Sequence, residues 1–230
     1  MFCNYDRTRD LGKREKMALH LYTYDSPPSA KDLAKAQRVL ENGGLIIYPS
    51  DVNWAVACDA TNSAAVDKVF RLKPSHPRDK PLSLLMHSIS QISEYAMLSS
   101  TAYRVAKKLL PGPYTFILTR AKNLPRQLGD KRKSVGVRIP NSPLLLALLE
   151  SFGRPLASGS LPKPEGKADF LTKGYEIDEY FGHAIDLILD LGDSLAPLET
   201  TIVDLTEEPP KIVRRGIGST DWLLEIGATE

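Results

Sequence analysis

Several residue types are scarce in this sequence of 230 residues, and each scarcity excludes a class of protein. Cys3 and Cys58 are the only cysteines, too few for a disulfide scaffold, and no Cys/His cluster has the spacing of a zinc site. No apolar run is long enough to span a bilayer, because Lys, Arg, Pro or Asp interrupts the longer ones. We therefore expect a protein of the reducing cytoplasm that is not embedded in a membrane.

An excess of either charge is also missing. The sequence holds 30 Lys and Arg residues against 28 Asp and Glu residues, which leaves a formal net charge of +2. This balance excludes a heavily basic nucleic-acid coat but permits a local basic face. The hydrophobic content of 42% and the charged content of 25% are typical of a globular protein in solution.

The domain organisation follows from length and local composition. A chain of this length forms one large domain, or a domain with a tail. Residues 1–16 are polar and charged and lack the apolar core of a secretory signal. We expect residues 1–16 to be a disordered leader, residues 17–220 to form a single domain and residues 221–230 to be a C-terminal tail.

Helices and strands alternate along most of the chain and give way to consecutive strands near its end. Helical spacing of apolar residues predicts helices over 30–42, 64–73, 89–95, 99–110, 143–151 and 175–181. Short apolar or β-branched runs predict strands over 18–24, 45–48, 82–86, 114–119, 134–140, 155–160, 187–190, 200–205 and 211–214, the last two as an antiparallel hairpin. The pattern favours an α/β (α+β) fold with a mixed parallel and antiparallel sheet and helices packed on it.

One stretch stands out, the sequence GGLIIYPSDVNWAVACDA over residues 43–60. A buried strand ends at Pro49, which has no N–H for a further ladder bond, and Ser50, Asp51 and Asn53 follow it. Ligands of α/β sheets bind beyond such strand ends. Taken alone, the same residues also fit a strand followed by an Asx-type turn, which is the commoner interpretation.

Hydroxyls and cations recur at other strand and helix ends, where carboxylates and histidines are nearly absent. The set comprises Ser50, Arg71, Lys73, Lys80, Ser134, Arg138, Ser158, Ser160, Thr200, Thr201 and Arg214. Such groups suit a bound polyanion rather than paired-carboxylate or triad catalysis. With no Walker A or GxGxxG sequence, a nucleotide would be bound in another way. Each residue singly also has a structural explanation, such as a surface cation, a turn hydroxyl or an ion pair.

Six motifs follow one another between about residues 30 and 218. They are YPSDVNWAVACDA, FRLK…RDKPLSLLM, PGPYTFIL, VGVRIPNSP, PLASGS and TTIVDLT…KIVRRG. In this order they resemble the YrdC/YciO family of threonylcarbamoyladenylate synthases and their relatives. The resemblance implies a twisted, open, mixed α/β sheet with a large basic cavity. It also implies a nucleotidyltransferase that converts L-threonine, bicarbonate and ATP into threonylcarbamoyl-AMP and pyrophosphate, for the threonylcarbamoyladenosine modification of tRNA.

The resemblance assigns roles to individual residues. The L-threonine pocket would comprise Ser50, Lys80, Arg138, Ser158 and Thr200, with the Arg138 guanidinium as a fork for the amino-acid carboxylate. The nucleotide side would comprise Arg71, Lys73, Ser134, Ser160 and Arg214. The catalytic residues would be Lys73, Lys80 and Arg138, because Lys and Arg stabilise charge on phosphates. Mg²⁺ would arrive with ATP, and no protein metal site or tightly bound cofactor is implied.

Two departures from the family pattern fall on the nucleotide side. The family's Lys-Gly-Arg-Pro element becomes KPSHP at residues 73–77, without the arginine, and its Ser-x-Asn element becomes SLP at residues 160–162, without the asparagine. Each lost group would be worth roughly 1–3 kcal/mol. These losses resemble the YciO branch and imply weak or altered activity. They leave open a second interpretation, a non-catalytic protein that binds a nucleotide or double-stranded RNA in the same cavity.

Overall fold

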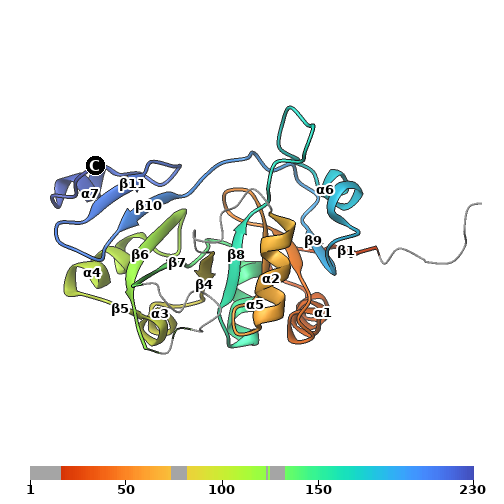
Figure 1. Ribbon diagram of the computed structural model, residues 1–230, viewed down its shortest axis with the longest axis horizontal. Coiled ribbons are helices and arrows are strands. Elements are labelled where there is room, and N and C mark those ends of the chain that lie inside the picture. The colour runs from red at the N-terminus through yellow and green to blue at the C-terminus, as the bar shows by residue number, and fades with distance from the viewer. Residues whose placement is uncertain (1–16, 74–81, 123, 125–132) are drawn as a thin grey trace, which may run out of the picture.

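The computed structural model describes residues 17–73, 82–122, 124 and 133–230. One sheet of eleven strands runs across Figure 1 from β1 on the right to β11 on the left, and helices pack on it. The predicted mixed sheet with flanking helices is confirmed. The predicted leader, residues 1–16, lies outside the described residues.

The described elements agree with most of the predicted ones. The strands are β1 (Leu19–Tyr22), β2 (Ile46–Pro49), β3 (Trp54–Asp59), β4 (Ser83–Leu85), β5 (Ala96–Met97), β6 (Tyr114–Arg120), β7 (Ser134–Arg138), β8 (Leu156–Ser160), β9 (Leu187–Asp190), β10 (Thr201–Asp204) and β11 (Lys211–Arg214). The helices are α1 (Ala30–Glu41), α2 (Ser63–Leu72), α3 (Ile89–Tyr95), α4 (Ser100–Leu109), α5 (Pro143–Phe152), α6 (Gly174–Phe181) and α7 (Asp221–Glu225).

The sheet combines parallel and antiparallel pairs. The strand order is β1-β9-β2-β3-β8-β4-β7-β6-β10-β11, and β5 pairs with β6. Strand β9 is parallel to β1 and β2, β4 is parallel to β7, and β6 is parallel to β10. The other neighbours are antiparallel, including the predicted hairpin of β10 and β11, which is confirmed.

Local signals at the helix ends fix where α1 and α5 begin and end. The Ser29 side chain accepts a hydrogen bond from the Asp32 N–H at the start of α1, and Ser142 does the same for Leu145 in α5. Pro143 opens α5, where its missing N–H has no helical partner to lose. The chain leaves α5 through Gly153 at φ 72°, a left-handed conformation that glycine adopts without steric cost.

Strand alternation sorts the apolar side chains into two layers. In β3, Trp54, Val56 and Cys58 join the larger core with residues of α2, α3, α4 and α6. Ala55 and Ala57 point the other way and join a second core with α1 and α5. A leucine of this second core such as Leu148 is fully buried, so its replacement by alanine would cost about 2–5 kcal/mol.

The second core covers only part of its face of the sheet. Its strand residues come from β2, β3, β4, β8 and β9, and among the described residues none comes from β6, β7, β10 or β11. In β7, Val135 and Val137 face the larger core, so alternation turns Arg138 toward the part of the opposite face that the second core does not reach. The fold thus leaves one area of the sheet to polar side chains.

Three short elements were not predicted. Strand β3 was missed because all six of its residues are buried, which removes the polar alternation that marks a half-exposed strand. The two-residue strand β5 is too short to give a pattern. In residues 221–230, which the sequence analysis treats as a tail, α7 buries Leu223 completely, and the Ile212 N–H donates to the Thr229 carbonyl at 2.7 Å.

Candidate functional site

A polar pocket opens on the part of the sheet face that α1 and α5 leave uncovered. It is lined by Val52, Asn53, Ala55, Ser83, Leu85, Thr115, Arg138, Ser158, Gly159, Ser160, Thr200, Ile202 and Arg214. Five of these were singled out in the sequence: Arg138, Ser158, Ser160, Thr200 and Arg214. They come from β7, β8, β11 and the residue before β10, so only the folded sheet brings them together.

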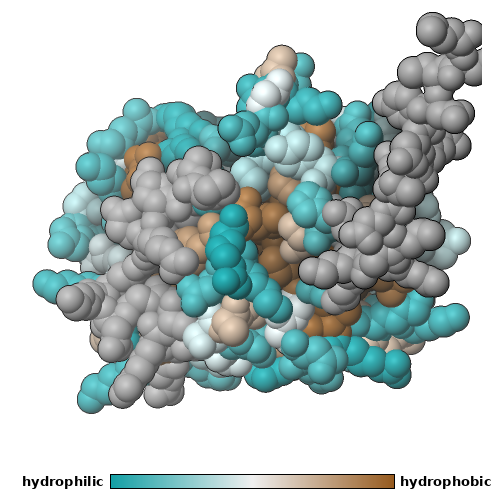
Figure 2. Space-filling model, turned by 45° about the vertical axis from the view of Figure 1, so that its right-hand side comes forward, coloured by the Kyte–Doolittle hydropathy of each residue, from teal (hydrophilic) through white to brown (hydrophobic). Residues whose placement is uncertain are grey.

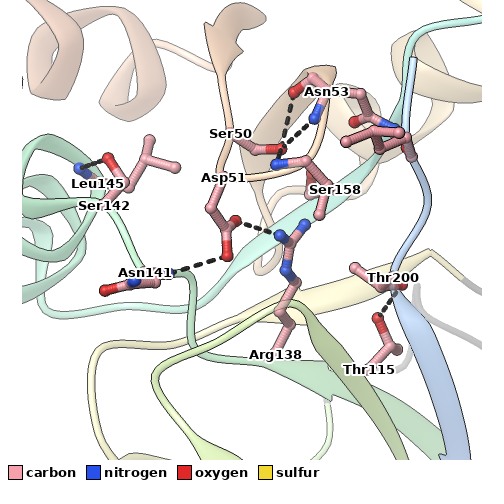
Figure 3. A network of polar contacts seen from close by, with 12 residues as sticks. Ser50, Asp51, Asn53, Thr115, Arg138, Asn141, Ser142, Leu145, Ser158 and Thr200 are labelled. Atoms are coloured by element: carbon pink, nitrogen blue, oxygen red, sulfur yellow. Dashed lines mark hydrogen bonds and ion pairs between the residues drawn. The ribbon is translucent and has the colours of Figure 1, made fainter. Parts of the chain in front are cut away.

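Arg138 lies at the end of β7 and is 7% exposed. Its Nη2 donates to the Asp51 carboxylate, whose second oxygen accepts the Asn141 N–H at 3.1 Å. Figure 3 shows the guanidinium between Asp51 on one side and Ser158 on the other. The buried Arg138 Nε has no acceptor among the described residues. The guanidinium therefore keeps donor capacity beyond the bond to Asp51.

Ser50 organises the turn that presents Asp51. The Ser50 hydroxyl donates to the Asn53 carbonyl at 2.7 Å and accepts the N–H groups of Val52 and Asn53 at 3.2 and 3.1 Å. These contacts form the Asx-like turn that the simpler interpretation of the motif describes. Ser50 is buried and lies outside the pocket lining, whereas its neighbours Val52 and Asn53 belong to it.

Ser158 is held by a short chain of hydroxyl contacts. Its Oγ donates to the Val56 carbonyl at 3.0 Å, so the Tyr48 hydroxyl, 2.6 Å away, is the donor to Ser158. Burial raises the pKa of Tyr48 to about 12, which keeps the phenol protonated for this role. Ser158 thus presents a fixed oxygen to the pocket, beside Arg138.

Thr200 and Arg214, which the sequence analysis places on different sides of the site, contact each other. The Arg214 guanidinium donates to the Thr200 carbonyl at 3.0 and 3.1 Å and to its hydroxyl at 3.1 Å. Thr115 lies 3.0 Å from the same hydroxyl, and Glu199 accepts from Arg214 Nη1 at 2.8 Å. At this wall of the pocket, the Arg214 guanidinium is therefore already hydrogen-bonded to protein oxygens.

Asn53 connects the pocket with a neighbouring apolar one. Its amide nitrogen donates to Ser160 Oγ at 3.1 Å and to the Leu198 carbonyl at 2.7 Å. Asn53 and Ser160 also line the second pocket, whose other walls include Trp54, Phe170 and further apolar residues. The two pockets therefore meet at the end of β8.

Lys73 approaches β8 from the other face of the sheet. Its Nζ donates to the Ser160 carbonyl at 2.6 Å and fills the space that a side chain at Gly159 would need, since a Cβ there would lie 2.8 Å from Nζ. The side chain is 8% exposed, and this burial lowers the pKa of Lys73 to about 8. Among the described residues no carboxylate pairs with it, so Lys73 is a desolvated cation that an anion would stabilise.

The remaining predicted residues lie elsewhere. Arg71 is exposed and lines a wider cavity between α2 and α6, together with Lys68, Lys163 and His183. From one side of the molecule, Figure 2 shows hydrophobic residues in a central hollow with hydrophilic residues around it. Ser134 begins β7, about 13 Å along the strand from Arg138, and does not line the polar pocket. Lys80 falls outside the described residues.

Three residues of the site had no individual role assigned from the sequence. Asp51 and Asn53 were noted only as polar groups that follow the strand end with Ser50, the kind of position where ligands bind. Thr115 sits inside a strand with ordinary β propensity, so nothing in the sequence marks it. Its role depends on the parallel pairing of β6 with β10, which places Thr115 opposite Ile202, two residues after Thr200.

Comparison with known proteins identifies the family. The Sua5/YciO/YrdC family model, described as "Telomere recombination", matches residues 38–216. The chain belongs to this family. An uncharacterized protein of Haemophilus influenzae is 38% identical over 89% of the chain and 98% of its own length. The uncharacterized protein YciO of Escherichia coli is 34% identical over 88% and 97%, respectively.

Relatives with a named activity are somewhat more distant. A threonylcarbamoyl-AMP synthase of Marinobacter nauticus is 32% identical over 78% of this chain and 94% of its own length. Among solved structures, E. coli YciO matches with a TM-score of 0.81 at 33% identity over 89% of this chain and 98% of that one. Sua5 of Pyrococcus abyssi, solved in complex with L-threonine, matches with a TM-score of 0.77 at 25% identity over 93% and 62%.

Two general features of the described residues bear on function. No described helix has both the length and the apolar character needed to cross a membrane. No group of three or more His, Cys, Asp or Glu side chains that could hold a metal ion occurs in the described part of the chain. The charged groups that the structure places at the site are mainly cations.

Proposed function

We propose that this protein is a threonylcarbamoyl-AMP synthase-like enzyme of the YciO type, with L-threonine bound in the polar pocket. The observation that carries the proposal is the convergence of Arg138, Ser158, Thr200, Ser160 and Arg214 on one pocket. The named synthases among its relatives and the Sua5 complex with L-threonine support it. The protein would act in the cytoplasm, where ATP and tRNA are available.

Recognition of the amino acid would rest on Arg138. A buried guanidinium offers several N–H groups in one plane, which match the two oxygens of a carboxylate. Ser158 and the Thr115–Thr200 hydroxyl pair lie around the same space and would bond the polar groups of L-threonine. Ser50 would act indirectly, by holding the turn that carries Asp51.

The nucleotide would lie toward the end of β8. Lys73 is buried there, bonded to the Ser160 carbonyl on the other face of the sheet, and Arg214 lines the polar pocket. The threonine amine and bicarbonate would form a carbamate with loss of water. A carbamate oxygen would then attack the α-phosphorus of ATP and displace pyrophosphate. Lys73, and Lys80 by resemblance, would stabilise the charge that develops on the phosphates.

Mg²⁺ would enter with ATP. The cations at the site would neutralise phosphate oxygens that the metal ion leaves free, and ATP itself would supply the oxygen ligands for Mg²⁺. The product would serve the threonylcarbamoyladenosine modification of tRNA.

A direct assay tests the proposal. Purified protein is mixed with ATP, L-threonine, bicarbonate and Mg²⁺, and threonylcarbamoyl-AMP and pyrophosphate are measured. We expect product at a low rate, since the missing arginine and asparagine together would cost two or more orders of magnitude, that is, about 3 kcal/mol or more. Absence of product together with absence of ATP binding would refute the synthase function.

A non-catalytic role is the second candidate. The observation that favours it is Pro162 at the end of the Ser160 element, in place of the family's asparagine, beside a cavity lined by Lys68, Arg71 and Lys163. Such a protein would bind a nucleotide or double-stranded RNA without turnover. Its affinity for RNA would fall steeply as salt rises, because phosphate contacts release counterions. RNA affinity that is independent of salt would exclude this role.

A further inference from the structure

Only one member of the Asp51–Arg138 pair lines the polar pocket. Arg138 lines the pocket, whereas the Asp51 carboxylate bonds Arg138 Nη2 and the Asn141 N–H and is not part of the lining. The Asp51 side chain is only 10% exposed. A ligand in the pocket would therefore meet the guanidinium, and Asp51 would act on the ligand through it (Figure 3).

Asp51 is itself rigidly placed. The Ser50 hydroxyl fixes its turn with three hydrogen bonds, and the Asn141 N–H holds its second carboxylate oxygen. The bond to Nη2 leaves the buried Nε of Arg138 without an acceptor among the described residues. A buried donor of this kind favours a ligand oxygen, because an unmade bond to a desolvated charge is costly.

The pair also sets the net charge that a ligand meets. A lone buried guanidinium would attract any anion, including inorganic phosphate. With Asp51 bonded to it, the pair has no net charge, so the remaining N–H groups offer hydrogen bonds without a strong general attraction for anions. A zwitterionic amino acid brings its own ammonium to balance its carboxylate, whereas phosphate brings only negative charge.

We propose that Asp51 is a positioning residue that makes the Arg138 pocket selective for a zwitterionic amino acid over a simple anion. It does so by orienting the guanidinium and by cancelling its charge. The inference rests on the proposed amino-acid role of Arg138.

The test compares two probes, L-threonine and inorganic phosphate, by isothermal titration calorimetry. In Asp51→Asn we expect the affinity for L-threonine to fall about tenfold and the affinity for phosphate to rise about tenfold, the size of one charged hydrogen bond. Opposite shifts cannot arise from general damage to the pocket, which would weaken both ligands. If the phosphate affinity is unchanged or falls with that for L-threonine, the proposal is overturned.

Two further variants keep the test decisive. Asp59→Asn makes the same change in another buried carboxylate, which pairs with Arg154 at 3.0 Å at the far end of β3, and should alter neither affinity. Asp51→Glu keeps the charge but shifts it by one methylene, so phosphate binding should stay weak while L-threonine binding falls. A rise in phosphate affinity in Asp51→Glu would overturn the proposal, and this variant decides the question if Asp51→Asn does not fold.

The experiment distinguishes a failure of the proposed amino-acid role from a failure of the inference about Asp51. If L-threonine does not bind the wild-type protein, or binds Arg138→Ala equally well, the amino-acid role of the pocket fails. The phosphate arm would still decide whether Asp51 suppresses anion binding. If L-threonine binds through Arg138 and Asp51→Asn changes neither affinity, only the inference about Asp51 fails.

Discussion

Two buried cations, Arg138 and Lys73, lie on opposite faces of the sheet and differ in how their charge is balanced. Arg138 has a carboxylate partner, Asp51, whereas the ammonium of Lys73 donates to a carbonyl, that of Ser160. A paired cation offers directed hydrogen bonds with little net charge, which suits a zwitterion. A desolvated cation without a counter-charge suits an anion such as phosphate. Under the proposed function, this difference would divide the site into an amino-acid side and a phosphate side.

The largest effect is expected when the paired cation is removed. Arg138→Ala should lower L-threonine affinity at least about 100-fold, because it removes the carboxylate fork. It should also lower the free energy of unfolding by about 3–5 kcal/mol, because Asp51 is left buried without its partner. Calorimetry with L-threonine and urea unfolding measure the two quantities.

A second substitution separates binding from stability. Adding Asp51→Asn to Arg138→Ala removes the stranded charge, so most of the stability should return while L-threonine binding stays lost. If L-threonine binding returned with stability, Arg138 would be a structural residue. The assignment of Arg138 to the amino acid, in contrast to Lys73, would then be wrong.

The effect of Lys73 on the free energy of unfolding should depend on pH. Its folded-state pKa of about 8 lies below the ordinary value of 10.5, so between these values the unfolded chain binds the proton and the folded chain does not. The contribution of Lys73 to the free energy of unfolding therefore rises with pH through this window and is unfavourable below it. Relative to Lys73→Met, the wild-type protein should gain on the order of 2–3 kcal/mol between pH 7 and pH 10.5.

Urea unfolding of the two proteins across this pH range measures the difference, and comparison with the variant cancels the other lysines. A matched control is Lys35→Met, because Lys35 pairs with Asp32 at 3.1 Å in α1, away from the site. A difference between wild type and Lys73→Met that does not change with pH would mean that the ammonium is not desolvated.

Substitution of Ser50 is expected to have a smaller effect on stability and binding. The result shows whether Ser50 shapes the turn or contacts the ligand directly. Ser50→Ala removes the hydrogen bonds that shape the turn and should cost about 1 kcal/mol of stability, with a modest loss of L-threonine affinity through Asp51. Ser50→Thr keeps the hydroxyl and should be nearly neutral. A large loss of L-threonine binding at unchanged stability would instead make Ser50 a direct ligand contact, as the family resemblance implies.

The sequence was most informative about elements and about single polar residues at strand ends. Periodicity predicted the helices other than α7 and most strands, because amphipathic helices and strand ends carry local signals. Ordered motifs pointed to Arg138, Ser158 and Thr200, which the fold gathers in one pocket.

Pairing between distant residues could not be predicted from the sequence. The contact of Arg214 with Thr200 and that of Asp51 with Arg138 depend on the order and register of the strands. The separation of Arg71 from the polar pocket and the approach of Lys73 to β8 from the other face depend on where α2 packs. No local pattern encodes these facts, because each side chain alone has an ordinary structural use.

The smallest expected effect is the uptake of a proton by Lys73 when ATP binds. Near pH 8 the ammonium is about half deprotonated, and a nearby phosphate would raise its pKa, so binding should take up roughly half a proton. Calorimetric titration with ATP in two buffers of different ionisation enthalpy measures this uptake, and subtraction of the Lys73→Met value removes the titration of ATP itself. Equal proton uptake by wild type and Lys73→Met would mean that the phosphates of ATP lie away from Lys73. The assignment of Lys73 to a phosphate side would then be wrong.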